Sequence, residues 1–159
     1  MMNESMNLDD ESGTALIETV FASLLLMLLL LGAVEMGMAS YTSIEVGNAA
    51  KAAAQYATMN GGAWTSTGLD TTGMLAAARS EAGNLASNVT FPVAPTYTCS
   101  CTGAGTADCT TAPPTGCVGS RLIVTVTVNT QVTFTPPIKF PGSFGSMTMN
   151  GFAQEEVLQ

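Results

Sequence analysis

Cys99, Cys101, Cys109 and Cys117 are the side chains of this sequence that are best placed to react with one another. They occupy nineteen residues that are also rich in glycine and proline. Cysteine zinc sites usually show Cys-x-x-Cys spacing or nearby histidines, and this stretch has neither. Two disulfide bonds are therefore favoured, because they would hold together a loop too polar to be stable alone. Cys99 and Cys101 are too close to pair, so each is expected to pair with Cys109 or Cys117, and both connectivities remain open.

The rest of the composition argues against an enzyme. The chain has 159 residues and no histidine, which removes the commonest general base and a common metal ligand. No nucleophile with a matching base, phosphate loop or metal cluster is recognisable. Lysine and arginine total four, too few for a surface that neutralises phosphates. We expect a non-enzymatic protein without metal, cofactor, small-molecule substrate or nucleic-acid partner.

An apolar run dominates the N-terminal part of the chain at residues 15–34, ALIETVFASLLLMLLLLGAV, in which Glu18 is the only charged residue. At about 1.5 Å per residue, a helix of this length spans roughly 30 Å, the thickness of a bilayer's hydrocarbon core. The run predicts a transmembrane helix in contact with lipid. A carboxylate inside a bilayer costs about 2.5 to 3.5 kcal/mol on insertion scales, so Glu18 needs something to offset it.

The residues before the run resemble a processing signal. A polar, acidic leader at residues 1–13 ends in Gly13, and the sequence TALIE follows. This arrangement resembles the class III signal of type IV pilin-like proteins, in which a prepilin peptidase cuts after the glycine and leaves a glutamate fifth in the mature chain. The resemblance implies cleavage between Gly13 and Thr14.

The same resemblance implies a partner for Glu18. The new α-amino group of Thr14 on a neighbouring subunit would offset the carboxylate, aided by the dipole of the helix N-terminus. Two alternatives remain open: the amine of the same chain fills this role, or Glu18 stays solvated near the headgroups.

The longer run GTALIETVFASLLLMLLLLGAVEMGMASY, with its alanine-rich continuation, resembles the TadE-like family of minor pilins. This family belongs to the tight-adherence (Flp) pilus machinery, and its members are inferred to be processed by a dedicated prepilin peptidase. The resemblance implies a structural protein that helps to assemble or anchor a pilus, with that peptidase, other pilin subunits and the assembly machinery as partners. One departure is that family leaders usually carry Lys or Arg before the glycine, whereas this leader carries four acids.

Two other functions remain open beside the minor pilin. One is a major, filament-forming pilin of a type IV-like system. The other is a membrane-anchored surface or binding domain that does not assemble. A secretory signal cleaved at Gly37-Met38-Ala39 is a rival for the apolar region, but it would lack a positive n-region and have an unusually long apolar core.

The expected location is the bacterial inner membrane, with one crossing and the C-terminal domain outside the cytoplasm, or a surface pilus into which the chain is incorporated. The only basic residue near the apolar run is Lys51, and the positive-inside rule alone would put its side in the cytoplasm. One lysine is a weak signal, whereas the four cysteines indicate an oxidising compartment.

Helix-favouring composition continues beyond the apolar run and predicts one long helix over residues 14–60. Its outer half is rich in alanine, and we expect that alanine face to pack on the protein's own domain rather than on another helix. Glu35 is expected to be solvated near the outer membrane interface. The residues expected to share one helix face are Tyr41, Ile44, Ala52, Tyr56 and Met59.

Residues 61–159 are predicted to form one small α+β domain outside the cytoplasm, with a disulfide loop at residues 99–117. A second helix is expected to begin after Asp70, a candidate N-cap, and to reach Leu85. Together with the long helix and an antiparallel sheet, these elements give an α+β, pilin-like fold.

The sheet is predicted from one strongly alternating segment. Residues 121–135, RLIVTVTVNTQVTFT, place apolar side chains on one side and polar ones on the other, as in a long antiparallel strand with one buried face. Residues 146–152 and 89–93 are expected to supply its partners. Glu155 and Glu156 are expected to lie in a frayed or solvated tail.

Overall fold

The computed structural model describes residues 8–59, 64–65, 68–112, 114–137 and 145–158. The chain divides into two compact units, Met1–Met38 and Ala39–Gln159, which we describe one at a time. A single helix, α1 (Leu8–Met59), has residues in both. The predicted long helix is therefore present, but it begins inside the predicted leader.

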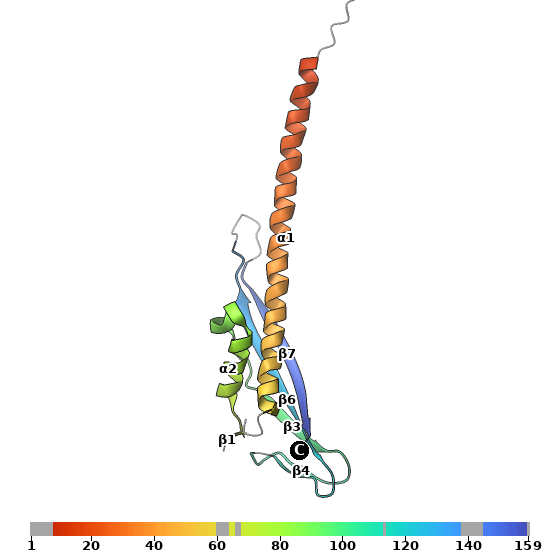
Figure 1. The fold of residues 1–159 in the computed structure, drawn as a ribbon, viewed down its shortest axis with the longest axis vertical. Coiled ribbons are helices and arrows are strands. Elements are labelled where there is room, and N and C mark those ends of the chain that lie inside the picture. The colour runs from red at the N-terminus through yellow and green to blue at the C-terminus, as the bar shows by residue number, and fades with distance from the viewer. Residues whose placement is uncertain (1–7, 60–63, 66–67, 113, 138–144, 159) are drawn as a thin grey trace, which may run out of the picture. The chain divides into compact units, whose positions relative to one another are not determined.

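The second unit contains the remaining elements (Figure 1). A short antiparallel pair, β1 (Trp64–Thr65) and β2 (Gly68–Leu69), precedes helix α2 (Thr71–Glu81) and the 3-10 helix η1 (Gly83–Asn88). Asp70 is the N-cap of α2, as predicted, because its carboxylate accepts a hydrogen bond from the Gly73 N–H at 3.0 Å.

A three-stranded antiparallel sheet forms the body of this unit, in the order β3 (Thr96–Cys101), β6 (Leu122–Phe134), β7 (Met147–Leu158). The central strand β6 lies within one residue of the predicted bounds at each end. Burial alternates along it as the sequence pattern indicated, because its even-numbered residues from Leu122 to Val132 face the core. A second, two-stranded pair, β4 (Ala107–Asp108) and β5 (Thr115–Gly116), lies in the loop between β3 and β6.

The two outer strands of the sheet differ from prediction. β7 continues to Leu158, and Glu155 and Glu156 are paired with Val126 and Thr125 instead of lying in a frayed tail. The third strand is β3 and not residues 89–93, where Thr90 makes only an isolated bridge to Gln131.

The core lies between the sheet and the alanine face of α1, so the fold is α+β with a long helix on a small antiparallel sheet. The alanine face packs on the protein's own domain, as expected, whereas Tyr41, Ile44 and Met59 are 60%, 62% and 81% exposed. Small side chains allow the helix backbone to approach the strands closely, which larger side chains would prevent. The α1 residues buried in this core are Val46, Ala49, Ala50, Ala53, Ala54 and Ala57.

Candidate functional site: the exposed apolar helix

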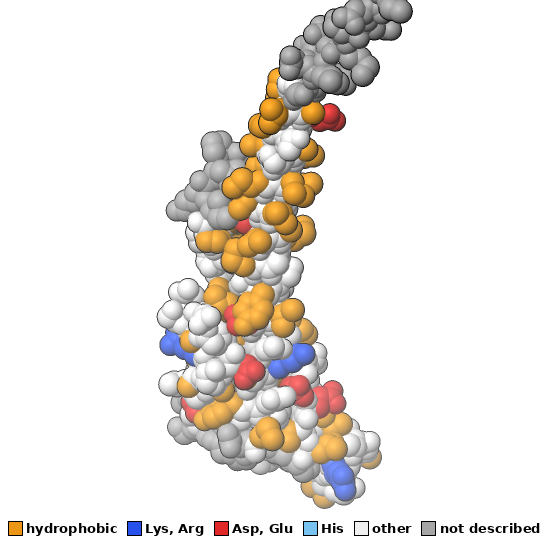
Figure 2. All heavy atoms as spheres, turned by 45° about the horizontal axis from the view of Figure 1, so that its top comes forward, with side chains coloured by type: hydrophobic (Ala, Val, Ile, Leu, Met, Phe, Trp, Pro, Cys, Tyr) orange, Lys and Arg blue, Asp and Glu red, His pale blue; other side chains and the backbone are white. Residues whose placement is uncertain are grey.

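The first half of α1 exposes its apolar side chains on every side. Figure 2 shows hydrophobic side chains gathered along this stretch. The large ones between Leu16 and Val34 are at least 53% exposed, except Leu31, which is half-buried. Among the described residues, α1 is the one helix long and apolar enough to cross a membrane, judged by length and composition. A helix that is apolar all round needs lipid or other helices around it.

The hydroxyl groups in this stretch are satisfied within the helix itself. Thr19 Oγ1 donates to the Ala15 carbonyl oxygen at 2.8 Å, and Ser23 Oγ donates to that of Val20 at 2.8 Å. Such local bonds are what polar side chains need in lipid, where water is absent. Glu18 differs, because its side chain is exposed and no described residue forms an ion pair with it.

Gly13 and Thr14 both lie within α1 and are exposed. A Cβ on Gly13 would meet nothing within 4 Å, so packing does not require a glycine there. Glycine in a helix interior costs about 1 kcal/mol relative to alanine. The predicted cleavage junction therefore lies at a residue that favours the helix less than alanine would.

Glu35 is buried, which overturns the expectation that it is solvated. It is only 8% exposed, and its Oε1 atom is buried without a hydrogen-bond partner. Distance along the helix alone does not predict this burial, because the burial depends on the helix face on which Glu35 lies. Its spacing of seven residues from Thr42 was the available signal, since that spacing puts Glu35 in line with the buried face of α1.

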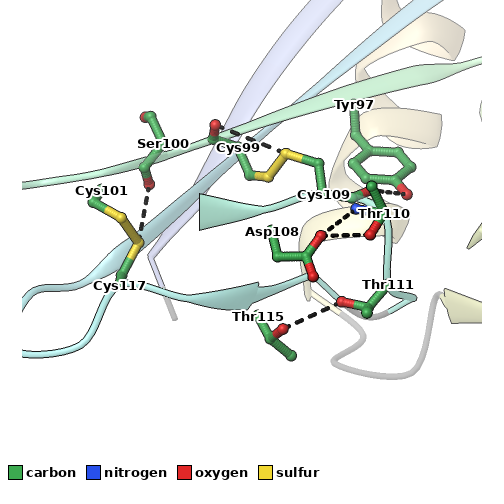
Figure 3. The surroundings of a disulfide bond; sticks show 10 residues. All are labelled: Tyr97, Cys99, Ser100, Cys101, Asp108, Cys109, Thr110, Thr111, Thr115 and Cys117. Atoms are coloured by element: carbon green, nitrogen blue, oxygen red, sulfur yellow. Dashed lines mark hydrogen bonds between the residues drawn. A yellow bond between two sulfur atoms is a disulfide. The ribbon is translucent and has the colours of Figure 1, made fainter. Parts of the chain in front are cut away.

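Two disulfide bonds fasten the loop that follows β3 (Figure 3). Cys99 is bonded to Cys109 and Cys101 to Cys117, with Cα–Cα distances of 6.0 and 5.4 Å. Of the two connectivities that the sequence left open, the structure thus contains the interleaved one. The Tyr97 hydroxyl donates to the Cys109 carbonyl oxygen at 3.1 Å, which adds a third link between β3 and this stapled loop.

Asp108 organises the tip of the stapled loop. Its Oδ1 atom accepts hydrogen bonds from the Thr110 hydroxyl at 2.6 Å and from the Thr110 N–H at 2.8 Å. These two bonds lower the pKa of Asp108, the hydroxyl contributing most. The part of the chain that the structure describes contains no group of three or more acidic, cysteine or histidine side chains that could hold a metal ion.

Known proteins share a part of α1 that runs from its exposed apolar stretch into its alanine face. Residues 13–55 match the family model of TadE-like proteins. The TadE-like segment begins at Gly13, includes Glu18, and ends at Gln55 within the alanine face. This match confirms the resemblance seen in the sequence and indicates a protein associated with a Tad-type pilus. No curated protein and no solved structure matches the chain.

Proposed function

We propose that the chain is a minor pilin of the TadE type, a structural subunit that takes part in assembling or anchoring a Flp-type pilus. The observation that carries this proposal is the TadE-like match over a helix whose first half exposes nearly all of its large apolar side chains. Residues 15–34 would sit in the inner membrane, and the sheet domain with its two disulfide bonds would lie outside the cytoplasm.

In this function, Glu18 recruits the chain into an assembly. Its carboxylate lies one helical turn beyond Thr14, and no described residue neutralises it. Cleavage after Gly13 would create an α-amino group on Thr14, and that amine on a neighbouring helix would supply the missing positive charge. In a low-dielectric membrane, such a pair is favoured far more than it would be in water.

The mature N-terminus tests processing directly. Intact-mass and N-terminal peptide analysis of the protein from its native host should give a chain that begins at Thr14. Gly13→Leu should leave the full-length chain, because the residue before the cut is lost. A wild-type chain that begins at Met1 would instead favour a membrane-anchored domain that does not assemble, and one that begins at Ser40 would favour a secretory signal.

Glu18→Ala tests recruitment separately from insertion. The variant should still fractionate with membranes, because the apolar run is unchanged, but it should be depleted from sheared pili or from crosslinked pilus complexes. Thr19→Ala is the matched control, since it removes a neighbouring polar group that is already bonded within the helix. Equal incorporation of the Glu18→Ala and wild-type chains would rule out pairing with a neighbour.

A further inference from the structure

The half of α1 that belongs to the globular unit has an uncovered stripe opposite its alanine face. The members of this stripe follow one another at steps of three or four residues, so they share one side of the helix. All of them are exposed, and the two apolar ones are 60% and 62% exposed. The uncovered stripe consists of Tyr41, Ile44, Asn48, Lys51 and Gln55.

Opposite charges lie on the two margins of the uncovered stripe. Lys51 is on one margin, and Glu45 lies beyond the other, where it raises the pKa of the Tyr41 hydroxyl. Six residues separate Lys51 and Glu45, which corresponds to about 120° around a helix, so the two side chains of one copy point in different directions. Lys51 is exposed and forms no ion pair with the described residues.

We propose that the uncovered stripe is a contact between copies of this chain, in which Lys51 of one copy pairs with Glu45 of the next. This inference rests on the proposed function, because chains inserted in one membrane in one orientation have parallel helices. Two parallel helices at the same height would place Lys51 opposite Lys51, which is repulsive. A stagger of six residues, about 9 Å, brings Lys51 opposite Glu45 and leaves Ile44 and Tyr41 to pack between the helices.

A stagger in this direction would also bring opposite charges together near the N-terminal end of the helix. Pairing the Thr14 amine of the next copy with Glu18 of the first requires a shift of four residues, about 6 Å, in the same direction. The flexible lysine side chain accommodates the remaining 3 Å or so. Each copy uses Lys51 towards one neighbour and Glu45 towards another, so the contact is heterologous and builds an open row instead of a closed dimer.

Charge reversal in trans tests this contact. The full-length chain is expressed in its native host with two different tags, and copies are crosslinked in the membrane and recovered through one tag. Lys51→Glu alone, carried by both tagged chains, should reduce recovery of the second tag about fivefold, and Glu45→Lys alone should do the same. A mixture of one Lys51→Glu chain with one Glu45→Lys chain should restore recovery to near the wild-type amount.

The mixture also separates a contact from a folding defect, because a misfolded variant is not rescued by another copy. Glu81→Lys, an equally large charge change at an exposed position of α2, is the control and should have no effect. Any one of three results would overturn the contact between copies. The single charge reversals have no effect, the mixture does not restore the lost recovery, or crosslinks form only to a different pilin. If the charge reversals do not change the crosslinked recovery and the mature chain begins at Thr14, this contact alone is rejected. A mature chain that begins at Met1 would instead reject the proposed function.

Discussion

The Thr130 hydroxyl donates a hydrogen bond to the Val46 backbone carbonyl oxygen at 2.8 Å, within the buried contact between β6 and α1. This bond joins residues 84 positions apart in the chain and satisfies a hydroxyl that is fully buried. It fixes how far α1 can slide along the sheet, because the donor and acceptor meet at one position only.

Thr130→Val should destabilise the domain by about 1 kcal/mol, since it keeps the side-chain shape but removes the donor. Thermal or denaturant unfolding of the full chain in detergent would measure the loss. Thr127→Val, on the solvent-facing side of the same strand, is the control and should change stability by less than about 0.5 kcal/mol. Equal effects at the two positions would show that the bond to Val46 contributes nothing.

Gly151→Ala should lower the stability of the domain, unlike the nearby substitution Gly47→Ala. A Cβ at this position would collide with the Val46 carbonyl oxygen and with Thr130 Oγ1, and the helix backbone cannot move aside cheaply. We expect a loss of about 2 kcal/mol or more in the same unfolding measurement. Gly47→Ala, where a Cβ meets nothing within 4 Å, should instead stabilise α1 by about 0.5 to 1 kcal/mol.

Asp70 should make the domain sensitive to acid. Its pKa is lowered by the hydrogen bond from the Gly73 N–H and then by that from the Tyr56 hydroxyl, which donates at 3.0 Å. Because the folded pKa lies below the unfolded one, the stabilisation is complete above the unfolded pKa and is lost as the pH falls through the folded one.

Asp70→Asn tests this titration, because the amide keeps a capping oxygen and cannot ionise. The melting temperature of the variant should fall less steeply than that of the wild type between roughly pH 4 and pH 2. Asp108 has a lowered pKa in both proteins, so the difference between the two curves isolates Asp70. Parallel curves would show that the Asp70 carboxylate does not titrate differently on folding.

The two disulfide bonds should each contribute to stability and should report the compartment of the domain. Replacing Cys101 and Cys117 with serine, or Cys99 and Cys109, should cost about 3 kcal/mol in either case by the chain-entropy relation. Alkylation of protein unfolded directly from its native host should find no free thiol before reduction. Four free thiols in that sample would contradict both the bridges and an extracytoplasmic domain.

Local pattern was sufficient to predict the elements whose side chains repeat regularly. The alternation of Val124, Val126 and Val128 with threonines predicted β6 almost to the residue, and the side-chain chemistry of Asp70 predicted the start of α2. In both cases, the information lies within a few residues of the chain.

Long-range packing decided the features that the sequence did not predict. Glu155 and Glu156 look like a tail until β6 provides a partner strand. The Tyr56 bond to Asp70 likewise depends on which faces of α1 and α2 meet. The junction at Gly13 and the role of Glu18 concern processing and neighbouring chains, and they stay predictions.

The stapled loop has a consequence for how the sheet can be extended. Through its two cysteine bridges and the Tyr97 bond, it is fastened to β3 and occupies that margin of the sheet. On the opposite margin, β7 offers a row of backbone N–H and C=O groups that no strand in the described part of the chain uses. An incoming peptide that binds by β-augmentation would therefore align with β7, beside the exposed ring of Phe152.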